Sequence, residues 1–228
     1  MKLSLSTSAI SIATTLMFVL LSSSSFSQSS HLHLLLNAVN TSFNYGDSNS
    51  ELQSYKKRIT GGQIGVTFQG GITQGLSVVA ETYFIMKGGT LKNNNPLTTS
   101  KSTLRLYQME MPVLARLHFG KFYVNSGPYI GYGLGGRMKS EGSETIPASS
   151  KPISFDNTAG GFKRWDMGVQ AGAGYVFQLK KASLALDLRY GYGLANVSRD
   201  EERYNRVLNF SIFIFKPWKS NPLVKQPS

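Results

Sequence analysis

Hydrophobic and polar residues alternate along several stretches of this chain, most regularly over residues 183–193. Leu186 and Leu188 fall on one face, while Asp187 and Arg189 fall on the other among serine, alanine and glycine. A period of two over eleven residues predicts a β-strand. Charges beside small residues suit a crowded polar interior and the apolar face suits lipid, which is the pattern of an outer-membrane barrel strand.

The same alternation returns in seven other segments, which are 31–40, 63–69, 76–87, 104–119, 122–135, 163–177 and 208–215. Short connections near 70–75, 119–121 and 179–182 alternate with long polar ones at 41–60, 88–102, 136–161 and 197–205. Short periplasmic turns and long outer loops are typical of outer-membrane barrels. The sequence therefore predicts an all-β fold, an eight-stranded antiparallel up-and-down transmembrane β-barrel, whose interior is about wide enough for side chains to fill it.

The N-terminus predicts a signal peptide over residues 1–27. A short positive start precedes a patchy apolar region, and Ser25 and Ser27 are the small residues expected before cleavage at Gln28. The apolar region is shorter than the roughly 20 residues that a membrane-spanning helix needs. Residues 28–216 then form the outer-membrane barrel domain, and 217–228 form a C-terminal tail.

The chain is strongly basic, with 24 Lys and Arg against 12 Asp and Glu and a net charge of +12. Nucleic acid is one partner of such chains, but the longest basic run has only three residues, so no nucleic-acid partner is expected. Scattered cations near outer loops suit the phosphates of lipopolysaccharide. The residues predicted to contact lipopolysaccharide are Lys56, Lys57, Arg58, Arg137 and Lys139.

Several charged residues fall on the inward face of the predicted strands. They are Glu81, Glu110, Arg116, Asp166, Asp187 and Arg189. An unpaired charge inside a small barrel is costly, so these groups are expected to pair and to plug the interior. A path that conducts protons or ions is the functional alternative.

Aromatic residues are expected to form the girdles that lie at the two membrane interfaces. The candidates are Tyr83, Phe84, Tyr107, Tyr132, Trp165, Tyr190, Tyr192 and Phe210. No catalytic residue, cofactor or metal is predicted. No cysteine or tight acidic cluster accompanies His31, His33 and His118, and most serines lie in loops or the leader, away from a histidine that could activate them.

Four segments together resemble the PorT-like, porin-like outer-membrane β-barrel family of Bacteroidota. They are YQMEMPVLARLHF from Tyr107, SGPYIGYGLGG from Ser126, WDMGVQAGAGYVF from Trp165 and LALDLRYGYGLANV from Leu184. The resemblance implies an integral outer-membrane protein and no activity common to the family. The sequence departs from the family pattern at its end, because PWKSNPLVKQPS follows the last strand, whose final aromatic is Phe215.

These features predict an integral outer-membrane protein with a plugged polar interior and no enzymatic activity. Its role would be structural, adhesive or accessory to envelope assembly or protein export. Its partners would be outer-membrane lipid, lipopolysaccharide and envelope or secretion-machinery proteins. Two alternatives stay open: a narrow diffusion pore, and a secreted lipocalin-like barrel for a small hydrophobic ligand, which would need Leu184, Leu186 and Leu188 inside.

Overall fold

The computed structural model describes residues 31–215 except 74, 143–146, 159 and 180–182. Its strands are β1 (His31–Asn44), β2 (Lys56–Lys57), β3 (Ile59–Gly71), β4 (Leu76–Leu91), β5 (Ser102–Phe119), β6 (Phe122–Ser140), β7 (Ser149–Pro152), β8 (Trp165–Gln178), β9 (Ser183–Gly193) and β10 (Tyr204–Phe215). A short 3-10 helix, η1, spans Gly46–Asn49. The predicted signal peptide, the cleavage point at Gln28 and the C-terminal tail lie outside the described residues.

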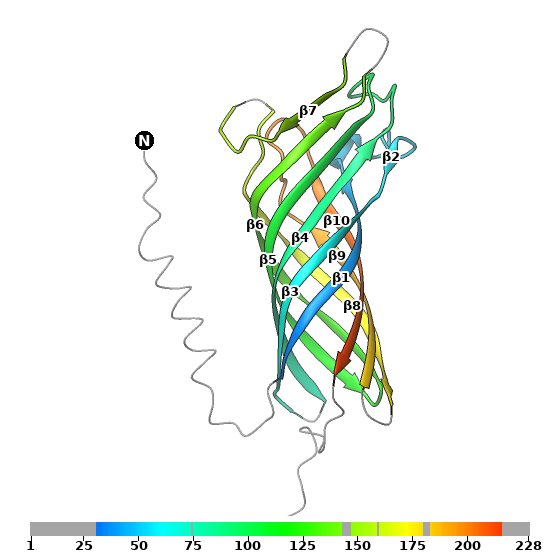
Figure 1. The fold of residues 1–228 in the computed structure, drawn as a ribbon, viewed down its shortest axis with the longest axis vertical. Coiled ribbons are helices and arrows are strands. Elements are labelled where there is room, and N and C mark those ends of the chain that lie inside the picture. The colour runs from blue at the N-terminus through cyan, green and yellow to red at the C-terminus, as the bar shows by residue number, and fades with distance from the viewer. Residues whose placement is uncertain (1–30, 74, 143–146, 159, 180–182, 216–228) are drawn as a thin grey trace, which may run out of the picture.

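Eight of the ten strands close into a single antiparallel ring (Figure 1). The ring runs β4, β3, β1, β10, β9, β8, β6, β5 and returns to β4, because β4 also pairs with β5. The first strand pairs with the last, as Ala38 opposite Phe210 illustrates. The predicted eight-stranded barrel is therefore confirmed. No helix in the described part of the chain is long and apolar enough to cross a membrane.

The strands reach further toward the long loops than the sequence predicts. β1 continues to Asn44, β4 to Leu91 and β6 to Ser140, so the predicted boundaries at 40, 87 and 135 were wrong. In Figure 1, β4, β5 and β6 extend beyond the outer end of β9, and the two small strands β2 and β7 add to their edges. The strands extend because alternate residues there are apolar and pack inward. The polar residues between them made these segments look like loops in the sequence.

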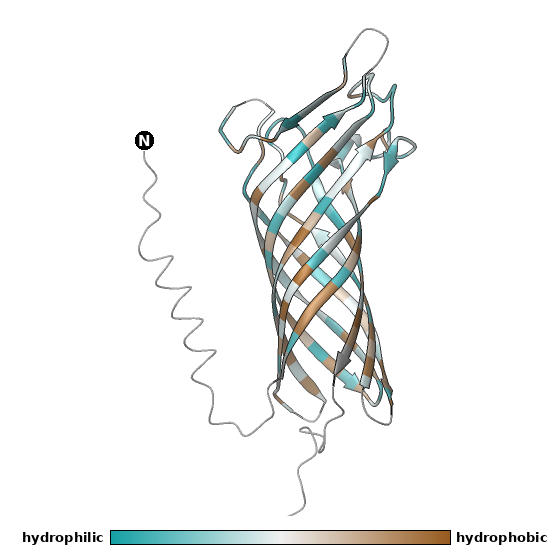
Figure 2. Cartoon of the chain, viewed as in Figure 1, coloured by the Kyte–Doolittle hydropathy of each residue, from teal (hydrophilic) through white to brown (hydrophobic). Residues whose placement is uncertain are grey.

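The outer face of the ring is an apolar belt. Each barrel strand contributes exposed large hydrophobic side chains, for example Leu34, Ile64, Phe84, Met111, Ile130, Val169, Leu188 and Phe210. Figure 2 shows hydrophobic and hydrophilic residues alternating along these strands. On β9, Leu188 is 51% exposed whereas Asp187 is 1% and Arg189 2% exposed. This orientation suits lipid outside the ring and is the reverse of what the lipocalin-like alternative needs.

The inside of the ring beside β1 and β10 is an apolar seam. Leu35 and Val39 of β1 pack there with Ile85 of β4 and Val207 of β10. Tyr83 joins them and is only 1% exposed, and its hydroxyl accepts a 2.8 Å hydrogen bond from the Gln170 amide. The prediction that Tyr83 belongs to an interface girdle was therefore wrong, because the alternation that places Glu81 inside also places Tyr83 there.

A second apolar cluster, the apolar cap, closes the end of the barrel that carries the long loops. Its buried residues are Phe43, Tyr45, Leu52, Leu91, Leu104, Leu106, Phe162 and Val197. They come from the extended strand ends and from three of the long connections. Burial raises the pKa of Tyr45 to about 12, so its hydroxyl stays neutral inside the apolar cap.

Candidate functional site: a paired interior and a charged rim

Arg189 lies at the centre of the polar half of the interior. Its Nη1 and Nη2 donate to the two carboxylate oxygens of Glu81 at 2.8 and 2.9 Å. Its Nε donates to Asp187 Oδ1 at 2.6 Å. Glu81 comes from β4 and the other two from β9, so this cluster joins strands that are not neighbours in the ring. A forked guanidinium that serves two carboxylates is among the stronger charged contacts in proteins.

Further hydrogen-bond donors surround the carboxylate of Asp187. The Tyr123 hydroxyl and the Asn125 amide donate to Asp187 Oδ2 at 2.8 and 3.0 Å. Arg116 lies further away, with its Nη2 3.9 Å from the same oxygen, and its guanidinium stacks 4.1 Å from the centre of the Tyr123 ring. The Asp187 carboxylate is thus bonded by one cation and two neutral donors and is approached by a second cation.

Lys87 organises a second charged cluster nearer the apolar cap. Its ammonium donates to Glu110 and, at 2.9 Å, to Asp166 Oδ2, and lies 4.7 Å from the centre of the Tyr129 ring. The Asn205 amide also donates to Asp166 Oδ2 at 2.7 Å. Lys87 was missing from the predicted charge set, although its place on the inward row of the 76–87 segment could have identified it.

The structure thus brings all six predicted interior residues, together with Lys87, into two connected clusters. Four carboxyls face three cations, and neutral amides and phenols donate further hydrogen bonds to Asp166 and Asp187. Such a set of fixed, mutually bonded charges fills space and holds strands in register. Removing one member would leave a buried charge uncompensated.

The five cations predicted to contact lipopolysaccharide all lie at the loop end, but they face different ways. Lys57, Arg58, Arg137 and Lys139 are exposed. Lys56 pairs with the inward-facing Leu91 and donates to Asn49 Oδ1 at 2.6 Å, so it points beneath the first loop. Burial and the nearby Arg206 lower the pKa of Lys56.

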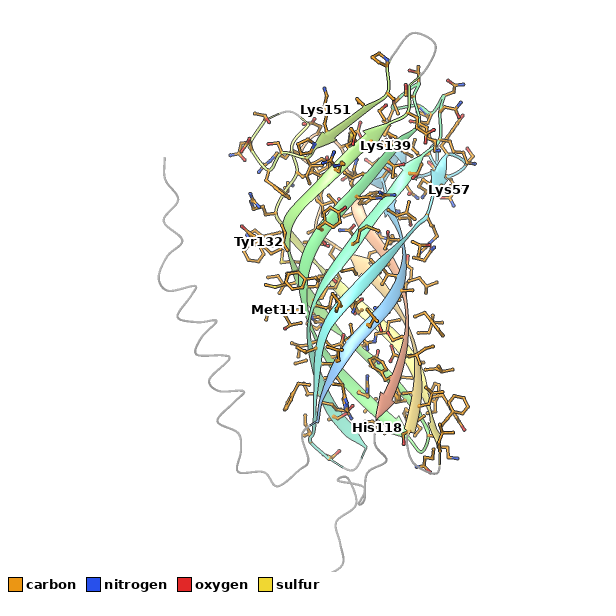
Figure 3. The ribbon with its side chains drawn as sticks, viewed as in Figure 1. Lys57, Met111, His118, Tyr132, Lys139 and Lys151 are labelled. Carbon is orange, nitrogen blue, oxygen red and sulfur yellow. The ribbon has the colours of Figure 1, made fainter. Side chains whose placement is uncertain are left out.

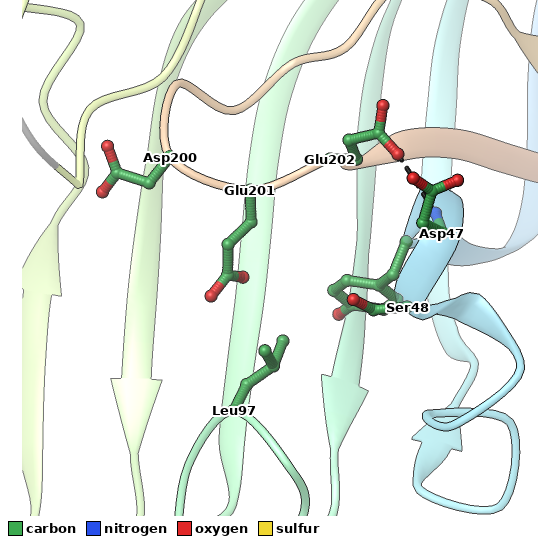
Figure 4. A pocket seen from close by; sticks show the side chains of 7 residues that line it. Asp47, Ser48, Leu97, Asp200, Glu201 and Glu202 are labelled. Atoms are coloured by element: carbon green, nitrogen blue, oxygen red, sulfur yellow. Dashed lines mark hydrogen bonds between the residues drawn. The ribbon is translucent and has the colours of Figure 1, made fainter.

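An acidic pocket of about 250 Å³ lies on the loop rim (Figure 4). Tyr45, Asp47, Ser48, Leu97, Asp200, Glu201 and Glu202 line it. Three of its four carboxylates have partners: Glu202 accepts from the Asp47 backbone amide at 3.1 Å, Glu201 pairs with Arg203 at 2.8 Å, and Asp200 accepts from the Gly160 backbone amide. Among the described residues, no group of three or more His, Asp or Glu side chains is placed to hold a metal ion.

A comparison with known protein families identifies the family of this barrel. Residues 26–199 match the family described as outer membrane protein beta-barrel domain. The chain belongs to this family. The family and the lipid-facing belt together point to the outer membrane, with the short turns on the periplasmic side and the long loops outside.

Two solved outer-membrane proteins are similar to this chain. Neisserial surface protein A is 10% identical, with 83% of this chain and 99% of that chain covered and a TM-score of 0.43. Ail, the attachment invasion locus protein of Yersinia pestis, whose structure holds the heparin analogue sucrose octasulfate, is 8% identical, with 81% and 98% covered and a TM-score of 0.40. No curated protein matches the sequence.

At its periplasmic end, this outer-membrane barrel contains a contact between a serine and a histidine. The Ser77 hydroxyl lies 2.8 Å from His118 Nε2 and also accepts a 3.2 Å hydrogen bond from the Gln69 amide. Such a pair resembles part of a hydrolytic site. Ser77 is 0% exposed, however. No substrate carbonyl could reach it in this arrangement, so the contact acts as packing for the interior.

Close packing of the interior predicts that Gly174 tolerates no side chain. A Cβ there would lie 2.2 Å from the Tyr123 hydroxyl, which is bonded to Asp187. We expect Gly174→Ala to lower the free energy of unfolding by about 1–3 kcal/mol, because overpacking displaces neighbours. Urea unfolding in lipid vesicles would measure the change. Gly62→Ala on β3 is the matched control, since a Cβ at Gly62 would have no atom within 4 Å; an equal loss in both variants would contradict the prediction.

Proposed function

We propose that this protein is a non-conducting outer-membrane barrel that acts through its outer surface, as an anchored or adhesive component of the envelope or as an accessory to envelope assembly or protein export. The observation that carries the proposal is the filled interior. The two charged clusters occupy the middle of the barrel, and the apolar cap covers its outer end. A barrel closed in this way offers partners only its loops, its rim and its lipid-facing wall.

The proposal extends to the lineage and the route of export. The four segments that resemble PorT-like barrels support membership of that Bacteroidota group. The charged start and the apolar region of residues 1–27 support a signal peptide that is cleaved before Gln28. We also propose that the chain has no enzymatic activity, which the burial of Ser77 supports.

Lipopolysaccharide is the proposed partner of the outer rim. The chain carries a net charge of +12, and exposed cations such as Lys57 and Lys139 lie at the outer end of the barrel. Each cation near an anionic membrane surface contributes about 1 kcal/mol before screening. Envelope or secretion-machinery proteins would bind to the loops, and crosslinking in intact outer membranes followed by recovery of this chain would identify them.

Conductance measurement tests whether the barrel is closed. We expect the full mature chain in planar bilayers to give no discrete current steps, because Arg189, Tyr83 and Lys87 are fully buried large side chains inside the ring. A large porin in the same bilayers verifies that channels would be seen. Steps that change in size with the interior substitution Lys87→Met would show that ions cross the barrel, and they would favour the diffusion pore instead.

A further inference from the structure

One stretch of the outer wall gathers cations in adjacent cross-strand positions. Directly opposite residues of antiparallel strands share a face. One cross-strand row therefore runs across Lys57, Thr90, Thr103, Lys139 and Ser150, from β2 to β7; Thr90 itself is buried. The next row, closer to the membrane, runs across Gly88, Arg105, Arg137 and Pro152. We call the four cations Lys57, Arg105, Arg137 and Lys139 the basic wall.

Arg105 and Arg137 are the unusual members of the basic wall. They are exposed and lie directly opposite each other on β5 and β6, where like charges destabilise the pair of strands. On the outer surface the described ion pairs join Lys101 to Glu141 and Arg203 to Glu201, and none involves Arg105 or Arg137. The polar contact that Arg137 makes is with the hydroxyl of Ser150, at 3.2 Å. The two arginines thus share one face of the sheet, and neither has a carboxylate partner among the described residues.

The basic wall lies just above the membrane interface. Arg105 is two residues beyond the exposed Tyr107 on the same face of β5, which in a strand tilted by about 40° is about 5 Å along the membrane normal. Tyr132 and Trp165, whose ring centroids are 5.0 Å apart, lie at the same end of the lipid-facing belt. Figure 3 shows Lys57 and Lys139 beyond Tyr132 and Met111 toward the loop end of the barrel. This height is that of the lipid headgroups in the outer leaflet.

We propose that the basic wall is a binding site for the phosphate groups of lipopolysaccharide, with Arg105 and Arg137 as its central pair. The backbones of directly opposite residues are about 5 Å apart, so both guanidiniums can donate to one phosphate. The anion would remove their mutual repulsion, while Lys57, Lys139 and the exposed Ser150 hydroxyl supply further donors. The inference rests on the proposed lipopolysaccharide partner and assigns it a place; Arg105 was absent from the residues predicted from sequence.

The test compares Arg105→Gln/Arg137→Gln with the wild-type chain. Full-length proteins in detergent are titrated with lipopolysaccharide that carries phosphorylated lipid A and with the same material after dephosphorylation. Two lost surface charges should weaken binding to the phosphorylated form about thirty-fold and leave binding to the dephosphorylated form unchanged. The control Lys121→Gln/Arg199→Gln removes the same charge from exposed positions outside the basic wall, and it should bind like the wild type.

Thermal unfolding separates a phosphate site from a structural role. Without lipopolysaccharide, the double variant should melt at or above the wild-type temperature, because the Arg105 and Arg137 repulsion is gone. With phosphorylated lipopolysaccharide, the wild type should gain stability by mass action and the variant should gain little. Unchanged binding by the variant overturns the site while the partner stands. A wild type that binds the phosphorylated and dephosphorylated forms equally overturns the phosphate site, and a wild type that binds neither form overturns the proposed partner as well. Equal weakening of binding in the control variant would show that net charge, and not the basic wall, causes the effect, which also overturns the site.

Discussion

Replacing Arg189 with glutamine should lower the free energy of unfolding by about 3–5 kcal/mol. The substitution leaves Glu81 without both of its hydrogen bonds to Arg189 and removes the Asp187 contact at 2.6 Å, while all these groups stay buried. Two carboxylates would then share an interior that has lost its central cation. Urea unfolding in lipid vesicles, followed by the fluorescence of the lipid-facing Trp165, measures the loss.

A double-mutant cycle identifies the cause of that loss. Glu81→Gln/Arg189→Gln should be less destabilised than the sum of its single variants, because the second substitution removes a charge that the first leaves unpaired. The exposed Arg199→Gln should change stability by less than about 0.5 kcal/mol. If Arg189→Gln behaved like Arg199→Gln, the interior charges would not be holding the strands together.

Replacing Leu188 with arginine should cost about 2–4 kcal/mol when the barrel spans a bilayer. Leu188 lies midway along β9 between Ala173 and Phe210, and half of its surface faces outward. An arginine there would have to enter the hydrocarbon or deform the bilayer around it. The same vesicle assay measures the cost.

The cost of an arginine should depend on how deep its position lies in the membrane. Ile72, in the periplasmic turn after β3, is exposed to the same degree as Leu188, at 53% against 51%. Because the penalty falls to about 0–1 kcal/mol near the interface, Ile72→Arg should be tolerated. Equal costs for the two substitutions would contradict a membrane belt centred on Leu188, and a stabilising Leu188→Arg would indicate water on that face.

The alternation of the sequence is sufficient to predict which way most barrel side chains point. On β9, the period of two places Asp187 and Arg189 inside and Leu188 outside, as the structure has them. The same period extends to Tyr83, whose aromatic ring suggested the interface. At Tyr83 the residue type predicted the membrane interface, whereas the alternation predicted the interior. The alternation was correct, because a strand cannot turn a single side chain to its other face without a bulge.

Contacts across the barrel could not be predicted in the same way. The alternation places Lys87 inside, but its pairing with Asp166 depends on the stagger between β4 and β8, which are not adjacent. The opposition of Arg105 and Arg137 was hidden as well, because the predicted strand 122–135 ended before Arg137. It appears only once β6 is known to continue outward in register with β5. The local alternation predicts which face of a strand each side chain lies on, whereas the shear of the closed ring determines which side chains meet across the barrel.

The apolar seam also bears on how the ring can be joined during folding. β1 has no acidic residue, lysine or arginine, and the inward positions of β10 are Asn205, Val207, Asn209, Ser211 and Phe213. Uniting the first and last strands therefore requires no ion pair to shed its water at the junction. The interior salt bridges join β4, β5, β8 and β9. Closure of the ring at β1 and β10 therefore brings together inward faces that carry no acidic residue, lysine or arginine.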